Sequence, residues 1–232
     1  MVIPGIPDLG AALHAVLGDR LGAAVVYGSA VTGDFIPGFS DVDLAIFAHG
    51  GPGLDEARAL QREAAALAAM VDGQLQLSHW IHAGRESARP LFVPGSLVNA
   101  WGEPPGPGWL HSEQSLRESG RSWLAELPAL VRRDAADWAV ASGQRRTGMV
   151  RLLATRLKPA IRAALAEQGY PALEVWVLPW SGLTDLWSRS DEAGANALRE
   201  TIGRLPPSPT DEQAVGDALL AMLWAGLDHG PG

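Results

Sequence analysis

The first hundred residues alternate between the hydrophobic spacing of helices and that of strands. Apolar residues recur at helical intervals over 9–21, where Asp8 is placed to cap the helix, and again over 54–70. Two short valine- or isoleucine-containing apolar runs and one segment of alternating polarity have the composition of buried or half-buried strands. We therefore expect two helices here together with four strands, at 23–27, 42–48, 74–81 and 97–101.

The pattern changes after a segment that no helix or central strand can continue through, GEPPGPG at 102–108. Beyond it the spacing predicts helices at 116–131 (with a kink at Pro128), 149–165 and 215–223. The segment LEVWVL at 173–178 has strand composition in a helical neighbourhood and is ambiguous. These elements predict an α+β chain. A small mixed sheet with flanking helices occupies 1–105, and a helical bundle occupies 106–232.

Composition narrows the possible functions. The chain has no cysteine, which excludes disulfides, thiolate zinc sites, iron–sulfur clusters and cysteine nucleophiles. Lysine and arginine number 18 against 26 acidic residues, a net charge of −8, so nucleic acid is an unfavourable partner. The N-terminus lacks the basic start and apolar run of a secretion signal, and no run approaches the roughly 18 apolar residues of a membrane span. We expect a cytoplasmic protein with no membrane partner.

One segment, YGSAVTGDFIPGFSDVDLAIF at 27–47, carries the candidate chemistry. A strand ends at Gly28 and Ser29, where a backbone without a side chain can approach a ligand and a following helical turn offers free amides to an anion. Asp41 and Asp43, preceded by Ser40, project from the same face of the next strand, with Cα atoms about 6.6 Å apart. Two such carboxylates repel each other unless a cation lies between them, and their oxygens suit Mg²⁺ or Mn²⁺ carrying phosphates.

Each half of this pattern has a plainer explanation. Aspartates in an SDVD sequence commonly accept hydrogen bonds from local amides in a turn, and a Gly-Ser pair after a strand is weak by itself. The combination is more specific, because an anion cradle beside a dicarboxylate clamp is what transfer of a phosphate-bearing group requires.

The pattern GS…SDVDL resembles the nucleotidyltransferases of the DNA polymerase beta superfamily, and GSAVTGDFIPGFSDVDL is similar to aminoglycoside adenylyltransferases. The resemblance covers about 21 residues, and the order of a small α/β domain before a helical one also agrees. It implies that Gly28 and Ser29 help to hold nucleotide phosphates and that Asp41 and Asp43 bind the divalent metals. The implied reaction moves a nucleoside monophosphate from a triphosphate to an acceptor hydroxyl and releases pyrophosphate.

The sequence departs from the family at the third carboxylate, which a neighbouring strand should supply. The counterpart position is Gln76, which cannot take a proton near neutral pH. Asp72 has the same strand parity but lies about 13 Å away along an extended chain. Three explanations stay open: an acid from elsewhere acts as base, the acceptor needs no strong base, or the chain binds nucleotide without turnover. The acids that could fold over the site are Glu86, Glu113, Glu118 and Asp134.

The most basic run of this acidic chain lies in the helical half, at Arg145, Arg146, Arg151, Arg156 and Lys158. Arg151 and Lys158 share a helix face and are candidate ligands of the β- and γ-phosphates, although an ordinary solvated helix face is the simpler explanation of the run. His79 and His82 have a spacing that can bind metal, although packing at the end of the strand is the simpler explanation of both. Three tryptophans near the domain junction could stack on a base: Trp80, Trp101 and Trp109.

We therefore predict a metal-dependent nucleotidyltransferase that uses a nucleoside triphosphate, ATP favoured, with the nucleotide between the two domains. The acceptor could be a cationic small molecule, which negative charge attracts, or a protein hydroxyl. The alternatives are a catalytically impaired nucleotide-binding protein that acts as a sensor or interaction module, and an unrelated α+β protein in which SDVD is a structural turn.

Overall fold

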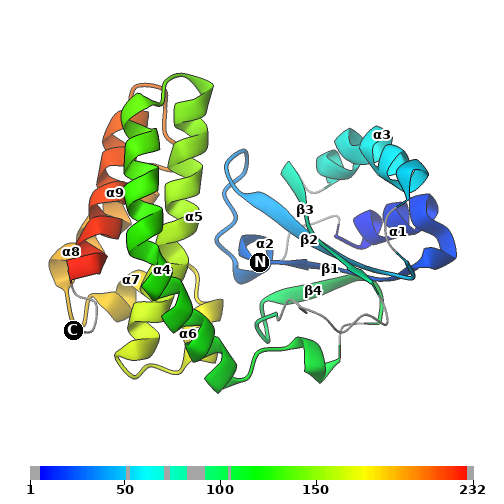
Figure 1. Cartoon of the computed structure of the whole chain (residues 1–232), viewed down its shortest axis with the longest axis horizontal. Helices are drawn as coiled ribbons and strands as arrows, with labels where there is room; N and C mark the ends of the chain where they lie inside the picture. Colours follow the sequence, from blue (N-terminus) through cyan, green and yellow to red (C-terminus); the bar gives the residue numbers. More distant parts are fainter. Residues whose placement is uncertain (1–5, 51–52, 71–73, 83–91, 104–105, 229–232) are drawn as a thin grey trace. The chain divides into compact units, whose positions relative to one another are not determined.

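The computed structural model describes residues 6–50, 53–70, 74–82, 92–103 and 106–228. The chain forms two compact units, Met1–His111 and Ser112–Gly232, so the division falls a few residues beyond the GEPPGPG segment (Figure 1). The first unit is an α/β unit and the second is helical, which confirms the predicted α+β class. Within the described residues, no helix combines the length and the apolar character that crossing a membrane requires.

The first unit is built on a four-stranded mixed sheet with the order β3-β2-β1-β4. Its strands are β1 (Leu21–Tyr27), β2 (Asp41–Ala48), β3 (Gln74–His82) and β4 (Leu97–Gly102). β1 pairs antiparallel with both β2 and β4, whereas β3 runs parallel to β2. The parallel pair needs a long crossover, which the helix α3 (Leu54–Met70) provides. All four predicted strands and the predicted helix over 54–70 are therefore present.

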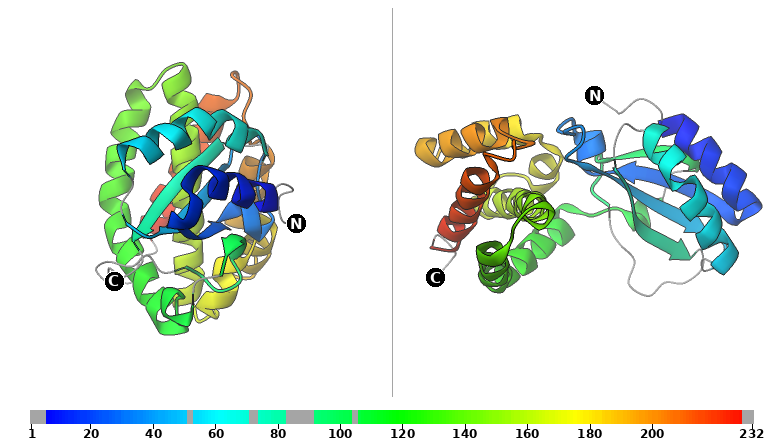
Figure 2. Two further views of the ribbon diagram at one scale, coloured as in Figure 1. Left: turned by 90° about the vertical axis from the view of Figure 1, so that its right-hand side faces the viewer. Right: turned by 90° about the horizontal axis from the view of Figure 1, so that it is seen from above.

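Two helices cover one face of the sheet. α1 (Ile6–Leu17) and α3 pack against each other, and with the sheet they enclose a core that includes Leu9, Leu13, Val26, Leu44 and Ile46 (Figure 2). These strand residues have even numbers, so beyond the irregularity between Leu21 and Ala23 the odd-numbered positions of β1 and β2 face the opposite side.

The first helix is shorter than its spacing predicts. It ends at Leu17 because Gly18 adopts a positive φ of 58°, and a 3-10 turn, η1 (Gly18–Arg20), leads into β1. Leu21, although it continues the helical spacing, is the first residue of β1, and Asp8 lies inside α1 instead of capping it. The prediction of a helix over 9–21 was therefore wrong at both ends: Gly18 ends the helix before Leu21, and the helix already includes Ile6 and Asp8 at its start.

The other face of the sheet carries a smaller aromatic cluster. Buried Val25, Ala45, Ile81 and Phe92 form its centre, and a partly buried tyrosine, a phenylalanine, two leucines and a tryptophan pack around it: Tyr27, Phe47, Leu97, Leu110 and Trp109. Trp109 belongs to the 3-10 turn η2 (Pro107–Trp109). This face also carries the odd-numbered aspartates of β2.

The second unit is helical throughout its described residues. Its elements are α4 (Glu113–Val140), α5 (Gln144–Glu167), α6 (Ala172–Val177), α7 (Trp180–Trp187), α8 (Glu192–Gly203) and α9 (Glu212–Asp228). α5 packs against both α4 and α9, and the three lie side by side (Figure 1). The ambiguous LEVWVL segment forms the short helix α6, and Pro128 lies inside α4.

Candidate active site

The site begins where β1 stops. Gly28 has φ 76° and ψ −145°, a conformation that residues with a side chain rarely adopt, and the four-residue helix α2 (Ser29–Thr32) follows it. Its carbonyl accepts hydrogen bonds from the amides of Val31 and Thr32, which fixes the turn. A Cβ atom on Gly28 would lie 2.8 Å from Oδ2 of Asp43. Glycine is therefore required both by the backbone angle and by the carboxylate that lies against it.

The two aspartates lie at the start of β2, at its first and third residues, on the aromatic face of the sheet. Asp41 and Asp43 are half-buried and the intervening Val42 is fully buried, so the two carboxylates share a face, as the spacing predicted. Burial is the main cause that raises the pKa of the Asp43 carboxyl, and the charge of Asp41 adds to the rise. Asp43 pairs across the sheet with Tyr27 of β1 and with Gln76 of β3.

A bulge in β3 brings an unexpected residue to Asp43. Leu77 pairs with Leu44 and His79 pairs with Ala45. Ser78 is therefore an extra residue that has no residue of β2 in register with it. Its hydroxyl donates a hydrogen bond of 2.7 Å to Oδ1 of Asp43. The carboxylate is thus held between Ser78 on one oxygen and the Gly28 turn on the other.

Tyr27, the last residue of β1, pairs with Asp43 across the sheet and is the next neighbour of this carboxylate. Burial raises the pKa of Tyr27 to about 12, a hydrogen bond with the Ser78 side chain lowers it, and the negative charge of Asp43 raises it. The phenol therefore stays protonated throughout the physiological range. Its ring is parallel to that of His79 at 6.1 Å between centroids and meets the edge of Phe92 at 5.2 Å.

The electrostatics of Asp43 fit a cation. Burial raises the pKa of its carboxyl above the usual range, the Ser78 hydrogen bond opposes this rise, Asp41 adds to it and His79 lowers it. A divalent cation bound beside Asp41 and Asp43 would remove the repulsion and favour the ionised carboxylates. The donor set of two hard oxygen ligands on one strand face therefore fits Mg²⁺ or Mn²⁺.

Gln76 stands where the sequence placed it, in register with Asp43 on the neighbouring strand, and it is exposed. The position that should carry a third carboxylate thus carries a neutral amide. Among the residues that the structure describes, no group of three histidine or acidic side chains is arranged to hold a metal ion. Glu86 and the side chain of His82 lie outside the described residues.

Two serines of the motif have different surroundings. Ser29 is the first residue of α2, directly after Gly28, and is half-buried. The Ser40 hydroxyl accepts a hydrogen bond of 3.0 Å from the amide of Ile36 and so closes the loop that precedes β2. Ser40 is therefore committed to positioning that loop.

Arg151 and Lys158 lie on α5 of the second unit. Burial, with a smaller contribution from the charge of Arg162, lowers the pKa of Lys158 to about 6, and Nζ of Lys158 is 5.4 Å from the centre of the Trp180 ring. Two other members of the basic run have acidic partners, Arg145 with Asp137 and Arg156 with Asp134.

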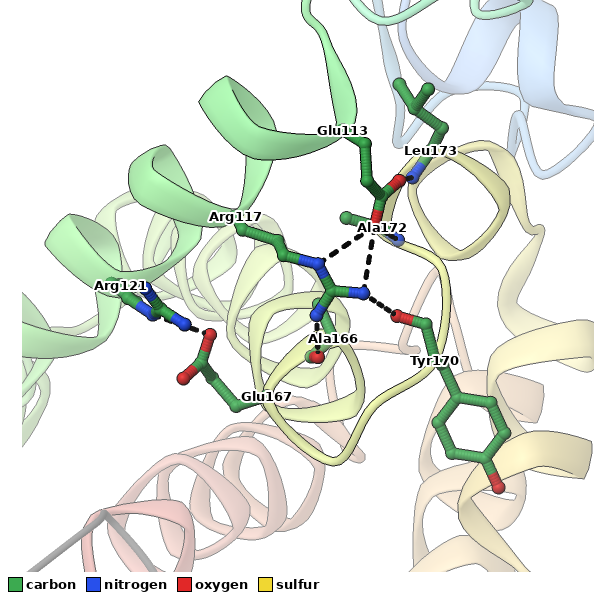
Figure 3. A network of polar contacts seen from close by, with 8 residues as sticks. All are labelled: Glu113, Arg117, Arg121, Ala166, Glu167, Tyr170, Ala172 and Leu173. Atoms are coloured by element: carbon green, nitrogen blue, oxygen red, sulfur yellow. Dashed lines mark hydrogen bonds and ion pairs between the residues drawn. The ribbon is translucent and has the colours of Figure 1, made fainter.

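The acids proposed to replace the missing carboxylate have structural roles in the second unit. Glu113 accepts hydrogen bonds from the amides of Ala172 and Leu173 at the start of α6, at 2.7 and 3.0 Å (Figure 3). It also pairs with Arg117, which donates to the carbonyls of Ala166 and Tyr170 at the end of α5.

The remaining two acids are equally explained. Asp134 is 1% exposed and forms an ion pair with Arg156. Glu118 accepts a hydrogen bond of 2.9 Å from Gln114 within α4. Burial and ion pairing explain the position of Asp134, and contact with the α6 amides explains that of Glu113; the proposal that an acid from elsewhere acts as base stays a prediction.

The match with known families coincides with this geometry. Residues 17–73 match the family model of the nucleotidyltransferase domain. The matched segment contains β1, the Gly28 turn, both aspartates of β2 and α3, so the match supports the nucleotidyltransferase superfamily. No curated protein sequence matches the chain. The narrower likeness to aminoglycoside adenylyltransferases stays a prediction.

Sequence reasoning missed Tyr27 and Ser78 as neighbours of Asp43, and it considered His79 only as a candidate metal ligand together with His82. A signal for Ser78 and His79 was present, because the apolar residues Leu77 and Trp80 are three apart where a regular strand needs two.

The three tryptophans suggested for base stacking have partners within the first unit. Trp80 donates to the carbonyl of Gly50, Trp101 stacks on His14 at 4.2 Å, and Trp109 meets the edge of Phe47 at 5.1 Å.

Proposed function

We propose that the protein is a metal-dependent nucleotidyltransferase that transfers a nucleoside monophosphate, from ATP by preference, to an acceptor hydroxyl and releases pyrophosphate. The observation that carries this proposal is the placement of Asp41 and Asp43 on one strand face, with the second carboxylate against the Gly28 turn, inside the segment that matches the nucleotidyltransferase domain. A lone structural turn would not require a glycine at that contact.

The residues divide the work of an in-line displacement. Asp41 and Asp43 would hold Mg²⁺ or Mn²⁺, which when bound neutralises charge on the phosphates. Gly28 and Ser29 would offer backbone and hydroxyl hydrogen bonds to the same phosphates, and Ser40 holds the preceding loop in place. The acceptor oxygen forms a bond to the α-phosphorus, the bond from that phosphorus to pyrophosphate breaks, and the acceptor proton passes to solvent or to a base.

Arg151 and Lys158 suit the charge of a triphosphate, and we assign them the same role that their sequence pattern indicated. An anion that binds Lys158 would favour its protonated form, because burial has lowered its pKa to about 6. Nucleotide binding through Lys158 is therefore expected to take up a proton near pH 7. Calorimetric titration in buffers of different ionisation enthalpy measures that proton.

A second candidate is supported by one observation. Gln76 lies in register with Asp43 and is neutral, so the position expected to supply a base cannot accept a proton. A protein with this site could bind nucleotide and act as a sensor or interaction module without turnover.

If the protein is an enzyme, we propose that the acceptor is either a cationic small molecule, such as an aminoglycoside, or a hydroxyl group of a protein.

Thermal melting with ATP, GTP, CTP and UTP, each with Mg²⁺ or with EDTA, tests the nucleotide site. Binding to the folded state stabilises it by mass action and so raises the melting temperature. At a ligand concentration 100 times Kd, the free energy of unfolding increases by about 2.7 kcal/mol. Asp43→Asn should abolish the Mg²⁺-dependent rise, whereas Asp55→Asn, whose side chain is 97% exposed on α3, should keep it. No rise with any nucleotide would refute the proposal.

Pyrophosphate release separates the two candidates. A chain that shows the Mg²⁺-dependent rise is incubated with the preferred nucleotide and a panel of aminoglycosides or with protein substrates. Release above the rate without acceptor supports the transferase. Binding without release from any acceptor supports the sensor.

A further inference from the structure

We infer that this site binds one divalent cation per nucleotide, where a site with three carboxylates would bind two, because Gln76 is neutral and the Ser78 hydroxyl contacts Asp43 in place of a third charge. The inference rests on the proposed nucleotide site and concerns how many cations that site can hold.

The first step is the set of available ligands. Asp41 and Asp43 are the acidic side chains on the site face of β2, and in the described part of the chain no third acidic or histidine side chain joins them in a metal-binding group. Two divalent ions in such sites stand about 3.5–4 Å apart and repel each other strongly, so each needs carboxylate oxygens of its own as well as shared ones. Two carboxylates supply that set for one ion.

The second step is the direction of the hydrogen bonds. Oδ1 of Asp43 accepts a hydrogen bond from the Ser78 hydroxyl, so one oxygen of Asp43 already has a neutral partner. Oδ2, the other oxygen, faces the Gly28 turn, where the phosphates are proposed to lie.

The third step is the bulge that creates this arrangement. The extra residue in β3 is Ser78 itself, placed one position after Leu77, and it lets a serine contact Asp43 although Gln76 is the residue in register with it. Gln76 is exposed and has room for a carboxylate of the same length. Gln76→Glu would thus restore a third charge without disturbing the Ser78 contact.

Ser78 is accordingly a positioning residue, because it acts through Asp43. Partners of metal ligands typically contribute 10- to 100-fold to metal affinity. We expect Ser78→Ala to weaken Mn²⁺ binding about 10-fold, and Ser78→Thr, which keeps the hydroxyl, to restore it.

Equilibrium dialysis of the full chain with Mn²⁺ and α,β-methylene-ATP tests the number of cations. The retained metal is measured by atomic absorption and the retained nucleotide by its ultraviolet absorbance. The expected ratio of Mn²⁺ to nucleotide is one for the wild type and two for Gln76→Glu. Gln168→Glu, the same change at an exposed position after α5, is the matched control and should keep a ratio of one.

The outcomes are distinguishable. A ratio of two in the wild type, or a ratio of one in both Gln76→Glu and the second variant Gln76→Asp, would overturn the inference while leaving the nucleotide site intact. Equal Mn²⁺ affinity in the wild type and Ser78→Ala would overturn the positioning role. Failure of the wild type to retain any nucleotide would refute the proposed function itself. Circular dichroism confirms that each variant is folded.

Discussion

Gly28→Ala is the sharpest test of how the site is built, because it adds one methyl group at a point where two constraints meet. The first is the backbone angle, with φ 76° and ψ −145°. The second is the Asp43 carboxylate, whose Oδ2 would lie 2.8 Å from the new Cβ. The methyl group must therefore displace either the turn or the carboxylate.

The cost can be worked from these two contacts. A residue with a side chain in this region of backbone angles costs about 1–3 kcal/mol. Movement of Asp43 away from the methyl group breaks its hydrogen bond with Ser78, a bond to a charged group that contributes about 1.5–3 kcal/mol. Together they predict a loss of about 2.5–6 kcal/mol, a large share of the 5–15 kcal/mol that stabilises a typical domain.

Gly18→Ala is the matched control in the same unit. Gly18 also has a positive φ, of 58°, but a Cβ there would have no neighbour within 4 Å. The control should lose about 1–2 kcal/mol from the backbone angle alone. Urea denaturation followed by circular dichroism gives both free energies of unfolding, and the melting-temperature rise with Mg²⁺ and ATP measures the site.

We expect Gly28→Ala to lose both stability and the Mg²⁺-dependent rise, and Gly18→Ala to keep the rise in full. If the two variants lost the same free energy and both still responded to Mg²⁺ and ATP, the carboxylate would not be held against the turn as described.

Three further changes test charges in the second unit by urea denaturation. Glu113→Ala should lower the free energy of unfolding by about 2 kcal/mol, and the control Glu118→Ala by under about 0.5 kcal/mol. Hydrogen bonds from the α6 amides lower the pKa of Glu113, so the stability that its carboxylate contributes should be lost progressively as the pH falls below about 4. Because burial lowers the pKa of Lys158 to about 6, the unfolded state binds its proton more tightly, and wild-type stability should rise by about 2–3 kcal/mol from pH 7 to 9 relative to Lys158→Met; an equal slope in both would contradict this. Asp134→Asn leaves a buried arginine without its partner and should cost about 3–5 kcal/mol, against under about 1 for the exposed Asp137→Asn; similar losses would refute the difference in burial.

The sequence predicted those parts of the fold in which a single hydrophobic period runs through an element. β1, β2, β4 and α3 follow one period each and appear within two residues of the expected ends. β3 changes its parity at Ser78, so a pattern of period two places His79 on the wrong face. The break is visible in the spacing of Leu77 and Trp80, but its use in holding Asp43 depends on the neighbouring strand.

Contacts distant in sequence explain the rest. The segment that became α6 has strand composition, yet Glu113, far away in the chain, accepts the first amides of that segment and so stabilises a helix there. In the same way, nothing local distinguishes Asp134 from a catalytic acid. Its ion pair with Arg156 and its burial come from the packing of α4 on α5.

The order of strands in the first unit has a consequence for how the protein opens. The Gly28 turn and both aspartates lie on β1 and β2, the two inner strands, whereas β3 and β4 form the edges of the sheet. Backbone amides of inner strands exchange with solvent deuterium only in the larger opening events, while edge strands fray at lower cost. Fraying of β3 alone would withdraw Ser78 and Gln76 but leave both aspartates and the Gly28 turn in place, so the contact between Asp43 and the turn would outlast the hydrogen bond between Asp43 and Ser78.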